Sequence, residues 1–258
     1  MSRFDTVTHF MRTNPLKIIS LNIETDRHFD RFIPFIKMKK PDIILLQEVL
    51  KKDMPYLEKA IGMRGRFVML AYLHREKDQP GIGLATFTNL PIANQYQAYY
   101  FGDSQKIPIK YGKLDKIARA ILVTKLIKKS QHYCVINTHF TWTPDGKPSE
   151  QQHKDLDHLL TLLSNIPEFV LCGDFNAPRG TVIFDTLALK YKDNIPKEIS
   201  TTIDKNLHSA GDLNLVVDGI FTTPEYCVDS IKVIDNLSDH CAILAKVNKK
   251  AKVMKCQA

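Results

Sequence analysis

The sequence contains no apolar run long enough to cross a membrane. Its longest apolar runs, such as 43–46, are far shorter than the ~20 residues that a membrane helix requires. The first residues include Arg3, Asp5 and Arg12 and lack an apolar stretch of about 7–15 residues, so no secretory signal is expected. We therefore expect a cytoplasmic protein without a membrane span.

Cysteine is also sparse. The five cysteines, at positions 134, 172, 227, 241 and 256, are odd in number and form neither a CxxC motif nor a cluster with histidine. This argues against a disulfide framework and against a zinc site, and it favours buried thiols in a reducing cytosol. The sequence also lacks Gly/Ser linkers, low-complexity stretches and internal motif repeats.

Length, composition and charge limit the number of domains and the class of protein. At about 150 residues per domain, the 258 residues could form one large domain or two small ones. An apolar content of 44% and a charged content of 25% exclude a disordered or fibrous chain. Part of the net charge of +8 is local, because residues 248–258 hold four lysines and no acid. Such a tail can add salt-sensitive affinity for nucleic acid or merely aid solubility, so the charge alone identifies no partner.

Hydrophobic periodicity predicts an alternation of strands and helices. The expected strands are 17–23, 42–49, 67–73, 83–88, 120–127, 133–138, 169–172, 216–221, 230–234 and 242–247. The expected helices are 29–38, 53–61 and 151–163. Two sheets packed face to face, with helices outside, satisfy this order. We expect one α/β domain over 17–247, preceded by a leader (1–16) and followed by a basic tail (248–258).

Polar side chains stand where these apolar strands end. They are Asn22, Glu48, His139, Asp174 with Asn176, Asp218, and Asp239 with His240. Each of them alone has an ordinary structural explanation, such as a loop carboxylate, a turn or a partly buried histidine. Six such sites together favour a function, because the strand ends of a rigid sheet are where functional groups are usually placed.

The residue types in this set suit one kind of chemistry. Carboxylates and amides are hard oxygen ligands, which suit Mg²⁺ or Mn²⁺ better than zinc. Two histidines can transfer a proton and donate to developing negative charge, and a second carboxylate can fix the tautomer of the working histidine. The set therefore predicts the attack of water on a phosphate ester beside a divalent ion.

The same residues carry a family resemblance. They occur as Asn22, Gln47-Glu48, Asn137-Thr138-His139, Gly173-Asp174-Phe175-Asn176, Asp218-Gly219-Ile220-Phe221 and Ser238-Asp239-His240. In this order they resemble the endonuclease/exonuclease/phosphatase superfamily, which includes deoxyribonuclease I, AP endonucleases, inositol-polyphosphate 5-phosphatases and neutral sphingomyelinases. The resemblance spans 17–247. It implies a four-layer α/β sandwich, in which two packed mixed β-sheets are flanked by helices and the site lies at one edge.

The resemblance also implies metal-binding residues. Glu48 matches the glutamate that holds the catalytic Mg²⁺, with Mn²⁺ as an alternative ion. Asp239 matches an aspartate of the same metal region, and Asn22 matches an asparagine near metal and phosphate. Glu24 falls where AP endonucleases carry an acidic residue near the metal, although it could equally be a loop carboxylate.

Catalytic roles follow from the same resemblance. Asp174 and Asn176 match the pair that contacts the attacking water and the scissile phosphate. His240 matches a histidine paired with a carboxylate, which Asp218 supplies, and His139 matches a donor to a phosphate oxygen. The general base is Asp174 or the His240–Asp218 pair, and we favour the pair.

The sequence says less about the substrate than about the chemistry of the site. Basic residues interleaved with an aromatic at 106–119, among them Lys110, Lys113 and Lys116, suit a nucleic-acid backbone or form a solvated hairpin. Arg119 is the best candidate for a phosphate contact, and Trp142 could stack on a base or simply pack. We expect a nuclease-like phosphodiesterase with nucleic acid as its partner. A phosphatase or phospholipase C-like enzyme is the alternative, and a non-catalytic scaffold is disfavoured because every motif position carries a usable group.

Overall fold

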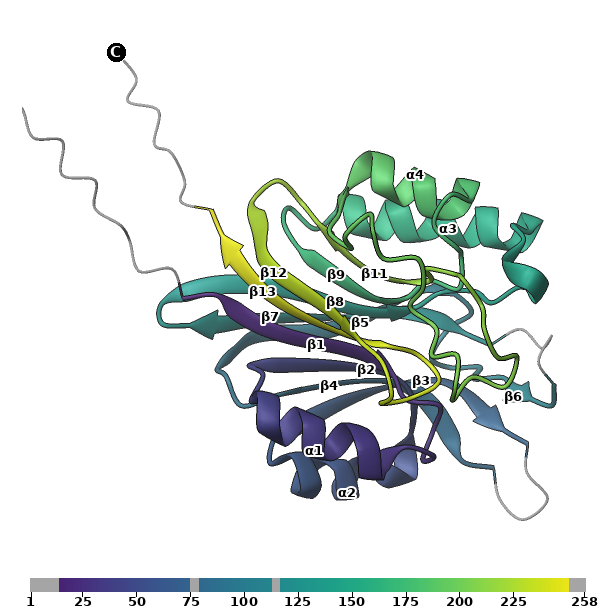
Figure 1. Cartoon of the computed structure of the whole chain (residues 1–258), viewed down its shortest axis with the longest axis horizontal. Helices are drawn as coiled ribbons and strands as arrows, with labels where there is room; N and C mark the ends of the chain where they lie inside the picture. Colours follow the sequence, from purple (N-terminus) through teal and green to yellow (C-terminus); the bar gives the residue numbers. More distant parts are fainter. Residues whose placement is uncertain (1–13, 75–78, 113–116, 251–258) are drawn as a thin grey trace, which may run out of the picture.

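The protein folds as two β-sheets packed face to face between two pairs of helices (Figure 1). This computed structural model describes residues 14–74, 79–112 and 117–250. The pair α1 and α2 covers one sheet, and the pair α3 and α4 covers the other (Figure 1). The expected four-layer α/β sandwich is thereby confirmed. Among the described residues, none of the helices has the length and apolarity needed to span a bilayer.

The first sheet has seven strands in the order β12-β13-β1-β2-β4-β3-β6. Their bounds are β1 Leu16–Asn22, β2 Ile43–Leu50, β3 Arg64–Leu73, β4 Gly81–Thr88, β6 Ile109–Lys110, β12 Tyr226–Ile234 and β13 Ala242–Lys249. The second sheet has six strands in the order β10-β11-β9-β8-β7-β5. Their bounds are β5 Ile92–Phe101, β7 Arg119–Lys128, β8 Gln131–His139, β9 Val170–Asp174, β10 Lys192–Asp193 and β11 Asp218–Thr222.

The helices bury one apolar face each against the outer sides of the sheets. Helix α1 (Phe29–Lys39) buries Phe32 and Ile36 and ends at Lys40, whose backbone is left-handed. Helix α2 (Met54–Ile61) follows a single 3₁₀ turn over Lys51–Asp53. Helix α3 (Glu150–Ser164) begins with Ser149 as its N-cap, because the Ser149 side chain accepts a hydrogen bond from the backbone N–H of Gln152. Helix α4 (Val182–Lys190) packs beside α3, and a second 3₁₀ turn covers Pro144–Gly146.

Two parallel strand pairs decide where the site forms. Strand β1 runs parallel to β2, and β8 runs parallel to β9. Parallel strands present their carboxyl ends at the same edge of a sheet. Asn22 at the end of β1 pairs with Gln47 of β2, and His139 at the end of β8 pairs with Asp174 of β9. Each sheet therefore places its polar strand ends at a single edge.

The sequence prediction lacks strand β5 and helix α4, as well as the two-residue strands β6 and β10. Strand β5 is an edge strand whose Asn94, Gln95 and Gln97 dilute the apolar alternation, so no strand was expected there. Helix α4 begins with a Val-Ile-Phe run that is typical of a strand, and the Thr181 side chain before it makes no capping hydrogen bond. In both places tertiary packing overrides a weak local signal.

The inner faces of the two sheets form an apolar layer that a few hydrogen bonds cross. The Tyr226 side chain from β12 is buried there, and its hydroxyl accepts a hydrogen bond from the Cys134 N–H of β8 at 2.9 Å. That N–H would otherwise lie unpaired between the sheets, which is energetically costly.

We expect Tyr226→Phe to lower the free energy of unfolding by about 1–3 kcal/mol, because it removes the acceptor of a buried N–H. Chemical denaturation would measure the change. Tyr191→Phe is the matched control, since the Tyr191 hydroxyl makes no hydrogen bond within the described part of the chain. Equal stability of Tyr226→Phe and wild type would show that the bond contributes nothing.

Candidate active site

The site lies at the edge where both sheets end, and Asp174 stands at its centre. The Asp174 side chain is 1% exposed, and one of its oxygens accepts a hydrogen bond from the Asn22 side chain at 3.0 Å. The same oxygen lies 3.5 Å from His139 Nε2 and 3.7 Å from His240 Nε2. Burial raises the pKa of Asp174 to about 6, although the nearby His240 acts against this rise. One buried carboxylate thus joins groups from both sheets.

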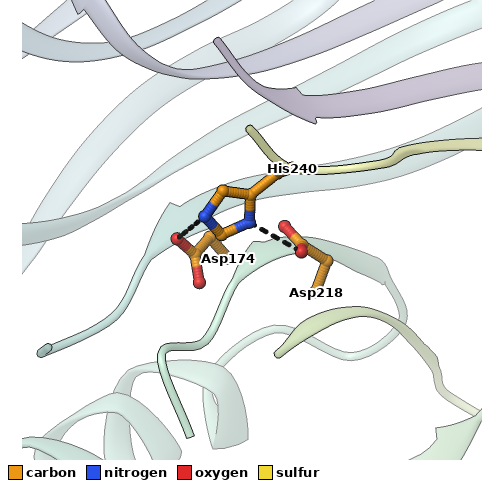
Figure 2. A group of neighbouring side chains, drawn as sticks. All are labelled: Asp174, Asp218 and His240. Carbon is orange, nitrogen blue, oxygen red and sulfur yellow. Dashed lines mark hydrogen bonds and ion pairs between the residues drawn. The ribbon is translucent and has the colours of Figure 1, made fainter. Parts of the chain in front are cut away.

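His240 and Asp218 form a directly bonded pair. His240 Nδ1 lies 2.8 Å from Asp218 Oδ2, and Figure 2 shows the ring between the Asp218 and Asp174 carboxylates. Burial opposes the charged imidazolium, but the two carboxylates outweigh it and raise the pKa of His240 well above 6.5. Because Nδ1 faces Asp218, the second ring nitrogen faces the interior of the site. The carboxylate therefore fixes which nitrogen can exchange a proton there.

His139 has the opposite electrostatic environment. Burial, together with the positive charges of Arg119 and Lys110, holds the pKa of His139 well below 6.5. Its backbone carbonyl accepts hydrogen bonds from the Arg119 side chain at 3.1 Å and from the Tyr100 hydroxyl at 3.3 Å. These bonds fix the end of β8. Because its pKa is lowered, His139 is a neutral imidazole beside the Asp174 carboxylate. In this state the ring can donate a hydrogen bond without carrying charge.

Glu48 stands where β2 departs from regular strand geometry. Its φ is 59°, and the register between β2 and β4 shifts between Leu46 and Val49. The carboxylate is 29% exposed, 3.3 Å from Asn22 Nδ2 and 4.0 Å from His139 Nε2. It borders a cavity of about 530 Å³ whose wall also includes Lys110. Glu48 is therefore much more accessible than Asp174 or Asp218.

The donor set fits a divalent cation. The pKa of Asp239 is raised by burial, and the negative charge of Glu48 contributes to this rise while His240 opposes it. Two hard carboxylates close enough to repel one another are suitable ligands for Mg²⁺, and Glu48 of this pair borders the cavity. Asp174, Asp218 and His240 also present ligand atoms within 4.8 Å of one another. His240 and Asp218 are already bonded to each other, so we favour the Glu48 side of the site for the cation.

Asn22 and Glu24 have other partners that limit direct ligation. The Asn22 side-chain oxygen accepts from the Glu24 backbone N–H at 3.2 Å, which leaves its NH₂ group to donate to Glu48 and Asp174. Asn22 thus orients two carboxylates. The two Glu24 oxygens pair with Arg27 at 2.8 Å and His28 at 3.0 Å, on the wall of the cavity. Metal ligation by Glu24 stays a prediction.

The remaining predicted residues lie around this centre. Asn176 has a left-handed backbone, with φ 49°. Its backbone N–H donates a hydrogen bond to the Asp174 carboxylate, and its side-chain NH₂ donates one to the Phe140 carbonyl. Arg119 lies behind His139 and is only 6% exposed, whereas Trp142 is 39% exposed. Phosphate or base contacts by these two residues stay predictions. Lys113 and Lys116 lie outside the described residues, as does 251–258 of the basic tail.

Sequence reasoning missed one histidine at the site. The His208 ring lies 6.5 Å from the His240 ring, and its Nδ1 accepts from the Ala210 N–H at 3.2 Å. It comes from the long segment between β10 and β11, where no periodic pattern or apolar strand points to a functional position. Only the folded path of that segment brings His208 to the site.

Comparison with known proteins establishes the class. The model of the endonuclease/exonuclease/phosphatase family matches residues 19–240, so the chain belongs to this family. A Bacteroides vulgatus endonuclease/exonuclease/phosphatase has a similar structure, with 19% identity, a TM-score of 0.71, and coverage of 92% of this chain and 99% of that one. The catalytic domain of human Nocturnin with bound sulfate is 18% identical, with TM-score 0.70 and coverage of 92% and 94%.

A third similar structure is D. rerio TDP2 complexed with a single-strand DNA product, which is 17% identical with a TM-score of 0.69. The match covers 92% of this chain and 100% of that one. At these identities the likeness establishes the fold. No curated protein matches the chain. The family in general consists of hydrolases that act on phosphoester bonds.

We expect Glu48→Gln to weaken Mg²⁺ binding by at least about tenfold, because it replaces an anionic oxygen ligand by a neutral amide. Isothermal titration calorimetry would measure the affinity. Glu168→Gln is the control, since that carboxylate is 25% exposed but pairs with Lys249, away from the site. Equal Mg²⁺ affinity of Glu48→Gln and wild type would show that Glu48 does not bind the ion.

Proposed function

We propose that the protein is a Mg²⁺-dependent, nuclease-like phosphodiesterase. The observation that carries this proposal is the position of Asp174 between two histidines of opposite electrostatic character, beside an accessible Glu48. Glu48 and Asp239 would hold the ion, with Asn22 orienting the carboxylates. When bound, Mg²⁺ or Mn²⁺ would neutralise charge that develops on the phosphate oxygens.

The His240–Asp218 pair is the proposed general base. As the water oxygen forms its new bond to phosphorus, its proton passes to His240 Nε2. The bond to the leaving oxygen breaks, and that oxygen departs with the bonding electron pair and takes a proton from solvent. Two carboxylates flank the imidazolium that results and raise the pKa of His240, so the ring can accept the proton only at a pH above this raised pKa, where it starts as the neutral imidazole. Asp174, which lies within 3.7 Å of both rings, orients the water.

His139 and Asn176 are the proposed donors to the phosphate. A neutral imidazole and a side-chain amide can both donate to the negative charge that grows on the phosphate oxygens. The backbone of Asn176 is fixed by Asp174, and that of His139 by Arg119 and Tyr100. Both donors are therefore preorganised, which is the condition under which such groups contribute most to rate.

Nucleic acid is the proposed substrate. Lys110 stands on the wall of the cavity beside Glu48, and its positive charge reaches His139. A lysine at this place would contact the phosphate backbone next to the scissile bond. Among the structural neighbours, D. rerio TDP2 was crystallised with a single-strand DNA product, which supports this substrate class.

We expect Asp218→Asn and His240→Ala each to reduce turnover by about 10²–10⁴-fold, because the two residues act as one base. The double variant should lose little more than either single variant. Turnover of a phosphodiester substrate at saturating Mg²⁺ would be measured for all three. Asp193→Asn, which alters a carboxylate paired with Arg179 outside the site, should keep wild-type turnover. If the loss in the double variant equals the product of the two single losses, the residues have independent roles, and Asp174 becomes the better candidate for the base.

We expect binding of single-stranded DNA to weaken steeply with salt, because each backbone contact releases counterions. Lys110→Ala should lower the slope of log affinity against log salt by about 1, and Lys190→Ala on α4 should leave it unchanged. Fluorescence anisotropy would measure the affinities.

A substrate panel tests the substrate class directly. It would compare plasmid DNA, abasic duplex, single-stranded RNA, nucleotides and phosphoinositides with Mg²⁺ and Mn²⁺. Hydrolysis confined to a small phosphomonoester or a phospholipid would overturn the nuclease assignment. Binding of single-stranded DNA that does not depend on salt would overturn it as well.

A further inference from the structure

The inference concerns the bulge in β2 that carries Glu48. Leu46 pairs with Ala85 and Val49 pairs with Gly83, so Gln47 and Glu48 stand opposite the single residue Leu84. Such a bulge inserts one extra residue and interrupts the ladder of hydrogen bonds at that point. The left-handed φ of 59° at Glu48 is a conformation that non-glycine residues adopt only when their surroundings impose it.

The packing of β2 shows what the bulge does to side-chain direction. Before it, Leu46 packs in the cluster beneath α1 and α2. In a regular strand the next residue on that side would be Glu48, because side chains alternate between the faces. Val49 takes that place instead, and Leu50 packs between the sheets. The extra residue is therefore Glu48, which escapes the apolar layer and reaches the cavity at the sheet edge.

Asn137 occupies the gap that the bulge opens. This residue of β8 is fully buried, and its side-chain NH₂ donates to the Leu46 carbonyl and to the Ala85 carbonyl, each at 3.0 Å. Those carbonyls belong to the last regular pair before the bulge. Its side-chain oxygen accepts from Gln47 Nε2 at 2.7 Å. A single amide thus bonds both strands of the bulged pair and the residue next to Glu48.

We propose that Asn137 is a positioning residue, which holds the β2 bulge open from the opposite sheet and so fixes the Glu48 carboxylate toward the cation site. The proposal rests on the proposed function for the identity of the ion. Asn137 stands two residues before His139 on the same strand, so both side chains project from the same face of β8. One strand thereby sets the spacing between His139 and Glu48, which is 4.0 Å from Nε2 to Oε1.

The test replaces the side-chain amide by an apolar group of the same branched shape. Asn137→Leu removes both donors and the acceptor, and Asn137→Ser is a milder second variant should the first fail to fold. Thr88→Val is the matched control, because Thr88 lies at the other end of β4, is buried and donates its hydroxyl to the Asp42 carbonyl. Melting temperature, Mg²⁺ affinity by calorimetry and amide hydrogen exchange of the metal-free protein would be measured for each.

We expect at least a tenfold loss of Mg²⁺ affinity in the Asn137 variants and none in Thr88→Val, even where their melting temperatures fall equally. In the metal-free Asn137 variants, peptides over 43–50 should exchange faster, while the same peptides in Thr88→Val stay protected. In a Glu48→Gln background, the Asn137 substitution should weaken Mg²⁺ binding no further, because the residue acts through Glu48.

Two results would overturn the inference. One is wild-type Mg²⁺ affinity in an Asn137 variant, and the other is unchanged exchange over 43–50 in the metal-free protein. A wild-type protein that binds no Mg²⁺ would instead contradict the proposed function, and the exchange measurement would still decide whether Asn137 holds the bulge.

Discussion

The space between the two sheets is largely apolar, so a polar group inside it is destabilising unless it finds a hydrogen-bond partner there. This constraint links the fold to the site. Asn137 bonds to Gln47 across the space, Asn22 bonds to Asp174 at its edge, and Tyr226 accepts from Cys134. Each of these bonds joins one sheet to the other. The first two bonds lie close to the edge where the functional side chains gather, and the third lies toward the other end of β8, so the sheets are held in one relative position.

That fixed position gives the two histidines opposite properties. His240 lies between two carboxylates, which raise its pKa, whereas burial and two nearby cations lower the pKa of His139. Both rings face the same Asp174 oxygen. Environments that push the pKa values of similar groups apart are how a site assigns distinct acid–base roles to them. In the proposed reaction, the first ring accepts a proton and the second donates a hydrogen bond.

Much of this arrangement could be predicted before the structure. The apolar runs located most of the strands, and the polar residues at their ends indicated the site, because strand ends on a rigid sheet support functional groups. The motif order indicated the family and its fold. Strand β5 and helix α4 escaped prediction, because an edge strand tolerates polar residues and a short helix can contain β-branched ones. His208 escaped because its segment has no periodic signal.

The sequence by itself determined which chemical groups are present and where each strand ends, since periodicity and residue type are local properties. Tertiary structure alone decided how those groups meet. It placed the Asp174 carboxylate between two rings, engaged Glu24 in ion pairs with Arg27 and His28, and inserted the extra residue that turns Glu48 toward the cavity. These features depend on contacts between residues far apart along the chain, such as Asn137 with the β2 bulge, and no local pattern encodes the distance between them.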